Sequence, residues 1–209
     1  MRHKQIISSN NFNRFHINNG KNNEYECYGD ILNSIYDIFD FMTSKYSKVV
    51  LIRFDLRFPE TFNRHDHNKH ITHLFKMIMD NSRNKGIGLQ YLWVREQSKA
   101  KLQHYHCMVL VNGHKIQKYY PFLKLVEDKW AYVLGVQEND GLVHFCNNNG
   151  LMIRKPYKNS VGSEKICQQE NYEKDLHDAF YWCSYLAKVN QKTNKLPPYV
   201  RRFNSSLRR

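Results

Sequence analysis

The fold of this chain is decided by residues 103–112, which read QHYHCMVLVN and form an apolar run behind a pair of histidines. A second run with strand character, LQYLWVRE, occupies residues 89–96. Short runs that contain β-branched and aromatic residues are typical of strands. Only six residues separate the two runs. We therefore expect them to pair as an antiparallel hairpin.

Helices and further strands are predicted on both sides of this hairpin. Apolar residues recur at helical spacing in residues 31–46, 71–79, 122–133 and 170–190. Further strands are expected at residues 49–58, 141–145 and 151–153. Antiparallel strands with intervening helices predict an α+β fold, in which helices cover a central sheet.

We expect a single folded domain over residues 31–195, flanked by two polar segments. Residues 1–30 are rich in Asn and are predicted to form a loose N-terminal arm. Residues 196–209 are predicted to form a basic, mobile C-terminal tail. A chain of 209 residues fits one domain of ordinary to large size.

The composition excludes several classes of protein. Hydrophobic residues make up 41% of the chain, enough to fill a core, which excludes general disorder. The net charge of +13 favours a polyanionic partner. No apolar run approaches the roughly 20 residues of a membrane span, and the N-terminus lacks the apolar core of a signal peptide. The five cysteines include no C-x-x-C pair, so neither a disulfide framework nor a zinc ribbon is expected. This cysteine usage agrees with a reducing compartment.

The histidine pair suggests a metal site. On a strand, His104 and His106 project from the same face, and two imidazoles so placed form a natural chelate. Glu96 ends the preceding strand, and the hairpin could bring its carboxylate beside them. This donor set suits Mg²⁺ or Mn²⁺ better than a closed structural zinc site. The alternative is that the histidines are ordinary surface or hydrogen-bonded residues and that Glu96 is a solvated charge.

A second group of candidate residues lies on the last predicted helix. Tyr181, Tyr185 and Lys188 are neighbours on one polar stripe, opposite the apolar stripe that is expected to face the core. A tyrosine pair beside lysine and away from the core can contact nucleic acid or supply a nucleophile. The lysine ammonium would stabilise the phenolate or neutralise a phosphate.

Together, these motifs resemble the HUH endonucleases of rolling-circle replication. The closer resemblance is to the inovirus gene-II-like replication proteins of filamentous phages and prophages, in which Trp-x-Arg-Glu precedes the histidine strand, as Trp93-Val94-Arg95-Glu96 does here. Residues 50–58, which contain Phe54-Asp55-Leu56, lie where that superfamily has its first strand motif. The resemblance covers about residues 49–188.

The resemblance implies a ferredoxin-like, RRM-like fold with a central antiparallel sheet of about five strands, and an HUH nuclease domain over residues 31–195. It implies metal-dependent, sequence-specific nicking and joining of single-stranded DNA at a replication origin or hairpin, through a 5′-phosphotyrosine intermediate. The two histidine ligands would be His104 and His106. The nucleophile would be Tyr185, and Lys188 would be its partner.

The resemblance also assigns Glu96 as the third metal ligand and Tyr181 as a second nucleophile, as in two-tyrosine members. The sequence departs from the fullest two-tyrosine pattern, because Ser184 and not Lys stands three residues after Tyr181. The catalytic role of Tyr181 therefore stays open. A second departure is Tyr105, which stands between the histidines where an aliphatic residue is usual; it faces the opposite side of the strand and is still bulky.

The expected partners follow from the charge and from the resemblance. Basic residues predicted to contact DNA are Arg53, Arg95, Lys155 and Lys158. A host helicase and polymerase are expected as partners, because a chain of this length has no room for a helicase module. The expected location is the cytoplasm of a bacterial host that carries the phage or prophage. No membrane is expected as a partner. The alternatives are a single-tyrosine HUH transposase, a relaxase, or a non-catalytic RRM-like nucleic-acid-binding protein.

A competing histidine cluster follows the first predicted strand. It comprises His65, His67, His70 and His73, and leads into a helix. In a helix, His-x-His side chains do not point the same way, so we interpret the cluster as a solvated helix start.

Overall fold

The predicted hairpin lies at the centre of an open six-stranded sheet. The computed structural model describes residues 5–63, 67–96, 102–137, 141–146, 150–157, 159, 161–189 and 196–207. The strand order is β10-β6-β7-β5-β8, and β9 also pairs with β5; every pair is antiparallel. The strands are β5 (Lys48–Leu56), β6 (Leu89–Glu96), β7 (His104–Asn112), β8 (Val143–Phe145), β9 (Leu151–Arg154) and β10 (Phe203–Ser205).

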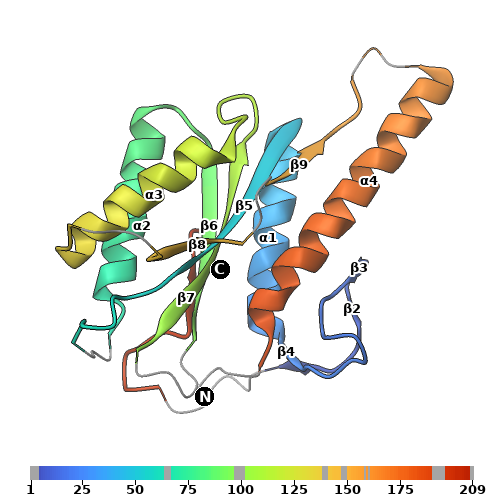
Figure 1. Ribbon diagram of the computed structural model, residues 1–209. Helices are drawn as coiled ribbons and strands as arrows, with labels where there is room; N and C mark the ends of the chain where they lie inside the picture. Colours follow the sequence, from blue (N-terminus) through green and yellow to red (C-terminus); the bar gives the residue numbers. More distant parts are fainter. Residues whose placement is uncertain are drawn as a thin grey trace.

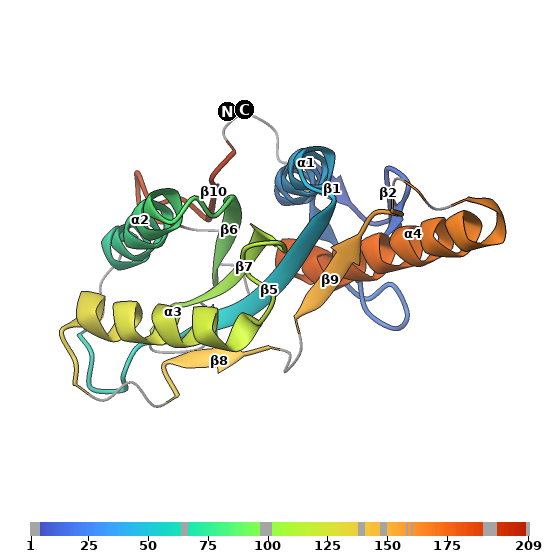
Figure 2. The ribbon, with the colours of Figure 1, turned by 90° about the horizontal axis from the view of Figure 1, so that it is seen from above.

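Helices cover both faces of this sheet (Figures 1 and 2). They are α1 (Gly29–Lys45), α2 (Lys69–Asn84), α3 (Tyr119–Leu134) and α4 (Gly162–Ser184), followed by the short 3-10 helix η1 (Tyr185–Ala187). One face carries α1 and α4, and the other carries α2 and α3. The predicted α+β fold, with a central antiparallel sheet covered by helices, is confirmed. None of the helices in the described part of the chain combines the length and apolar character needed to cross a bilayer.

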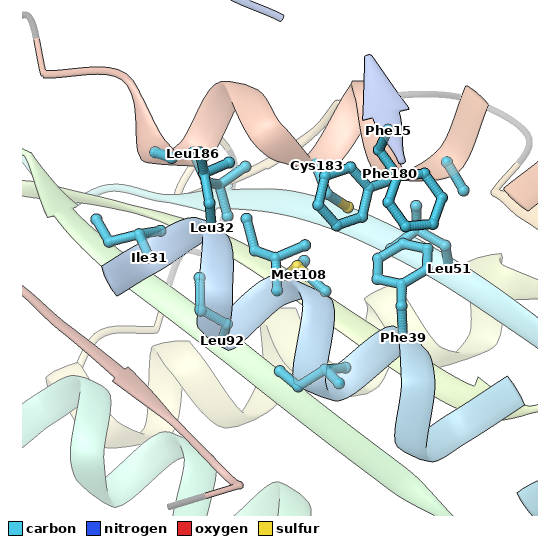
Figure 3. Close-up of a cluster of buried hydrophobic side chains, with 14 of the residues drawn as sticks. Phe15, Ile31, Leu32, Phe39, Leu51, Leu92, Met108, Phe180, Cys183 and Leu186 are labelled. Carbon is cyan, nitrogen blue, oxygen red and sulfur yellow. The ribbon is translucent and has the colours of Figure 1, made fainter. Parts of the chain in front are cut away.

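Two hydrophobic cores lie back to back across the sheet, because successive side chains of a strand point to opposite faces. In β7, Met108 and Leu110 face α1 and α4, whereas Val109 and Val111 face α2 and α3. Figure 3 shows part of the first core, where Met108 lies among side chains of α1 and α4. On that same face, the alternation continues from Met108 to His106 and His104, where apolar packing gives way to polar groups.

The prediction of a loose N-terminal arm was wrong for the described residues. Short strands pair in this segment: β1 (Ile6–Ile7) with β4 (Cys27–Tyr28), and β2 (Asn11–Phe12) with β3 (Phe15–His16). Phe15 is buried and stacks on Phe180 of α4 with ring centres 4.2 Å apart. The sequence hid this packing, because strands of two residues are too short to show any periodicity.

The C-terminal segment is also part of the fold, so its prediction as a mobile tail was wrong for residues 203–205. These residues form β10 and pair with β6 at the edge of the sheet, for example Phe203 with Val94. The backbone N–H of Arg95 donates to the carbonyl of Arg202, 2.7 Å away. The last helix also differs from the prediction, since it begins at Gly162 and gives way to η1 after Ser184.

Candidate functional site

Three potential metal ligands meet at one end of the central hairpin. The register of β6 and β7 places Glu96 directly opposite His104, and His106 lies two residues further along the same face. The Nε2 atoms of His104 and His106 lie 3.2 and 2.8 Å from Oε2 of Glu96. One potential ligand atom from each residue lies within 4.8 Å of the others. The predicted meeting of the carboxylate with the histidine pair is confirmed, and the group could hold a metal ion.

Asp55 is a further member of the site and is not among the ligands predicted from the sequence. In the pairing of β5 with β7, Asp55 lies opposite His106, and its Oδ1 is 2.6 Å from Nδ1 of that ring. An Nδ1–H that donates to Asp55 leaves Nε2 available for a metal, the usual arrangement of carboxylate, histidine and metal. The available signal was an acidic residue in an apolar strand, inside the Phe54-Asp55-Leu56 motif.

The two carboxylates change the acid–base properties of the site. Burial disfavours the imidazolium of His106, but hydrogen bonds with Asp55 and Glu96 outweigh burial and raise its pKa above the ordinary value. Burial tends to raise the pKa of Asp55, yet the hydrogen bond and positive charge of His106 lower it overall. Without a metal, the two carboxylates therefore favour the imidazolium form of His106 more than water does.

A tyrosine–lysine pair faces the same end of the sheet. Tyr185 begins η1 and Lys188 directly follows it, and Nζ of Lys188 donates to the hydroxyl of Tyr185 at 2.9 Å. The ring of Tyr185 meets the ring of His106 edge-on, with centres 6.2 Å apart. Lys188 is only 4% exposed. Two groups that are far apart in sequence are thus neighbours in the folded chain.

One family model, the YagK/YfjJ C-terminal domain, matches residues 8–206. The match therefore includes the six-stranded sheet, the helices that cover it and the polar site. The chain belongs to this family. It is a prophage-associated family, which agrees with the expected phage or prophage origin. No curated protein and no solved structure matches the chain. Membership of the HUH superfamily stays a prediction for this YagK/YfjJ C-terminal domain.

The match includes most of both segments that are predicted to lie outside the domain. It begins at residue 8, before β2, and ends at residue 206, after β10. Strands β2, β3 and β4 and the edge strand β10 are therefore part of the YagK/YfjJ C-terminal domain, whereas β1 precedes the match.

The structure treats the two candidate tyrosines differently. Tyr181 lies one turn before Tyr185 and is 44% exposed, and its carbonyl accepts a hydrogen bond from Oγ of Ser184. Among the described residues, the contacts that join Tyr185 to His106 and Lys188 have no counterpart at Tyr181. A nucleophilic role for either tyrosine stays a prediction.

Two of the four predicted DNA contacts have internal partners. Arg53 is buried and donates to the carbonyl of Trp182 at 2.7 Å, with its guanidinium over the rings of Trp182 and Tyr185. Arg95 is buried on the opposite face, where it donates to the carbonyl of His67 and to the side chain of Asn68. Arg53 therefore supports the end of α4, and DNA contact by either arginine stays a prediction.

The other two predicted DNA contacts follow β9. Lys155 is half-buried, and its backbone N–H donates to the carbonyl of Ser47 at 2.8 Å. Lys158 lies outside the described residues. In the competing histidine cluster, His65 also lies outside them, whereas His67 and His70 are half-buried with ring centres 5.3 Å apart. His73 is exposed on α2, whereas His70 in the first turn packs against Phe58 and Phe62, so the prediction of a solvated helix start is right only in part.

A cavity of about 660 Å³ opens beside the histidines. Its lining includes the polar residues Asp55, His104 and His106 and the apolar residues Phe58 and Leu102. A cavity of this size accommodates a small ligand or one residue of a polymer. This YagK/YfjJ C-terminal domain therefore combines a potential metal site, a tyrosine and a neighbouring cavity at one end of its sheet.

Proposed function

We propose that this protein nicks and rejoins single-stranded DNA in a metal-dependent reaction that passes through a 5′-phosphotyrosine, as in the initiation of rolling-circle replication. The observation that carries the proposal is the meeting of Tyr185 with the triad, since its ring lies 6.2 Å from that of His106. Nucleophilic catalysis on a phosphodiester needs a hydroxyl beside a centre of positive charge.

The donor set fits a divalent cation. Glu96, His104 and His106 would hold it, and Asp55 would fix the orientation of His106. Two nitrogens and a carboxylate oxygen, with positions left for water and phosphate, suit Mn²⁺ or Mg²⁺. When bound, the cation would neutralise charge on the scissile phosphate and make the phosphorus a better electrophile.

Tyr185 would act as the nucleophile. A phenol with a pKa near 10 reacts poorly at neutral pH, and the ammonium group of Lys188 would stabilise the phenolate as it forms. The phenolic oxygen attacks phosphorus, a P–O bond to tyrosine forms, and the bond to the 3′-oxygen breaks. The phenol proton passes to solvent, and the departing 3′-oxygen takes a proton to leave as a hydroxyl. Attack of a 3′-hydroxyl on the phosphotyrosine reverses these steps and joins the strand.

The charge of the chain supports a nucleic-acid substrate. A net charge of +13 attracts a phosphate backbone at any sequence, whereas the triad and Tyr185 act on one phosphate. A host helicase and polymerase would supply strand separation and synthesis. Whether Tyr181 alternates with Tyr185 decides between a two-tyrosine replication initiator and a single-tyrosine transposase.

The non-catalytic alternative is less well supported. RRM-like proteins stack bases on an open sheet face. Here, α1 and α4 cover one face of the sheet and α2 and α3 cover the other (Figure 2).

Covalent capture tests the proposal. The protein is incubated with Mn²⁺ and single-stranded oligonucleotides that tile the DNA flanking its gene, and adducts are separated on a denaturing gel. We expect an adduct with the wild type that EDTA prevents and that Tyr185→Phe abolishes. Tyr172→Phe, on the preceding helix α4, is the matched control and should react normally. Tyr181→Phe should leave the first cleavage intact; loss of strand joining would identify a second nucleophile.

Absence of any wild-type adduct across the tiled DNA would contradict the proposal. So would an adduct that survives in a Tyr181→Phe, Tyr185→Phe double variant.

A further inference from the structure

The N-terminal segment lies against the end of α4 that carries Tyr185 (Figure 1). The backbone N–H of Asn18 donates to Oγ of Ser184 at 2.7 Å, and the same Oγ donates to the carbonyl of Tyr181 at 2.7 Å. Ser184 is completely buried. One hydroxyl thus joins the N-terminal segment to the last turn of α4, immediately before Tyr185.

A second set of contacts holds the chain just after Tyr185. Cys27 forms an antiparallel bridge with Lys188, and the backbone N–H of Val189 donates to the carbonyl of Glu26 at 2.8 Å. The backbone is therefore tied to the N-terminal segment on both sides of Tyr185.

Tyr25 extends this contact to the lysine side chain. Nζ of Lys188 lies 4.8 Å from the ring centre of Tyr25 and 4.5 Å from that of Tyr185, so both rings contact the ammonium group. A lysine side chain has a flexible four-carbon stem and samples many rotamers when it is unrestrained. Contact with Tyr25 favours the rotamer that places Nζ at the hydroxyl of Tyr185.

We infer that residues 15–28 act as a clamp that positions the Tyr185–Lys188 pair, with Tyr25 and Ser184 as positioning residues. The catalytic role of the clamp rests on the proposed function, whereas the contacts that form the clamp do not. Reacting groups held away from their productive geometry lose rate steeply. The clamp thus explains why a polar N-terminal segment is folded against the catalytic end of α4.

Chemical labelling of Lys188 tests the clamp without DNA. The protein is treated briefly with an amine-acetylating reagent at neutral pH, and modification of Lys188 is measured by peptide mass spectrometry. At 4% exposure, Lys188 should be protected in the wild type. Tyr25→Ala should raise the labelling rate of Lys188 about tenfold, because loss of the ring exposes the lysine side chain to the reagent. Tyr25→Phe keeps the ring and should keep the protection.

Tyr119→Ala is the matched control, because it removes a half-buried tyrosine from α3, on the other face of the sheet. It should leave the labelling of Lys188 unchanged. Equal labelling of Lys188 in wild type and Tyr25→Ala would overturn the inference.

Single-turnover kinetics test the catalytic meaning. Tyr25→Ala and Ser184→Ala should each lower the rate constant of adduct formation at saturating DNA about tenfold. The DNA concentration at half-maximal rate and the affinity for Mn²⁺ should stay within about twofold of the wild type. Tyr25→Phe should restore the rate. A normal rate constant in both alanine variants would overturn the positioning role.

The two proposals can fail separately. If the wild type forms no adduct, the proposed function fails, and the labelling pattern of Lys188 still decides whether the clamp exists.

Discussion

Asp55 shows how one side chain can set the chemistry of its neighbour. It lies opposite His106 in the sheet and meets Nδ1 of that ring, while Nε2 faces Glu96. A carboxylate behind a metal-binding histidine fixes the ring and its tautomer, and raises its basicity toward the metal. The residue that orients the site thus comes from a different strand than the three potential ligands.

Replacement of Asp55 should weaken metal binding without removing any ligand. We expect Asp55→Ala to lower the affinity for Mn²⁺ by about 10–100-fold, the usual cost of losing such a partner. Isothermal titration calorimetry measures this directly. Asp40→Ala, which removes an exposed aspartate from α1, is the control and should bind Mn²⁺ normally. Unchanged affinity in Asp55→Ala would remove Asp55 from the site.

The raised pKa of His106 predicts how metal affinity depends on pH. A metal must displace the proton at Nε2, so protons compete with it. Because the pKa of His106 lies above its ordinary value, this competition should begin at a higher pH than for a free imidazole. Below the pKa, the affinity for Mn²⁺ should fall by up to about tenfold per pH unit, and above it the affinity should level off.

Titrations with Mn²⁺ between pH 5.5 and about 8.5 measure this profile, a range that brackets the ordinary histidine pKa of about 6.5. In Asp55→Ala, the pKa of His106 should decrease, and the falling limb should move to lower pH. An affinity that is independent of pH in the wild type would contradict the assignment of His106 as a ligand.

At the scale of elements, a short strand covers an edge that the long strands of the sheet leave exposed. The edge strand β10 has only three residues, yet it covers the exposed edge of β6. An uncovered edge presents unpaired N–H and C=O groups, which favour association between copies. The strand that carries Glu96 therefore depends on a segment from the far end of the chain.

A chain that ends at Arg202 tests this dependence. Loss of β10 should lower the melting temperature by roughly 5–10 °C, which corresponds to about 2–3 kcal/mol for a domain of this size. The truncated protein should also associate at high concentration. Differential scanning calorimetry and light scattering measure the two effects. A chain that ends at Leu207 loses charge but keeps β10, and should melt like the wild type.

At the scale of the whole molecule, attraction of DNA and reaction with it should be separable. The 32 lysines and arginines are spread through the chain, whereas the triad occupies one end of the hairpin. Backbone binding depends on the number of phosphates that are neutralised and falls with salt concentration.

Variants of the triad should therefore lose reaction but keep binding. Glu96→Ala and His104→Ala should reduce adduct formation by about 100-fold or more, the scale of losing a charge-stabilising group at a reacting centre. Their affinity for single-stranded DNA in EDTA, and the slope of that affinity with salt, should match the wild type. Fluorescence anisotropy over a range of salt concentrations measures both. Normal nicking by either variant would exclude a metal triad.

Much of the site could be predicted from the sequence, because the residues concerned obey local geometry. Alternation along a strand places His104 and His106 on one face, and a short connection returns Glu96 to them. Helical spacing likewise brings Tyr185 and Lys188 together, although the last turn is η1 and not part of α4. These relations depend only on the regular conformation of a few consecutive residues.

Only the tertiary structure decided which distant segments meet. The second neighbour of β7, on the side away from β6, could have been any other strand, and the choice of β5 is what places Asp55 behind His106. The same holds for β10 beside β6 and for Tyr25 beside Lys188, since a three-residue strand and a residue outside regular structure carry no periodic signal. The sequence by itself thus determined the triad and the tyrosine–lysine pair through local periodicity, whereas non-local pairing, driven by burial over the whole core, decided what surrounds them.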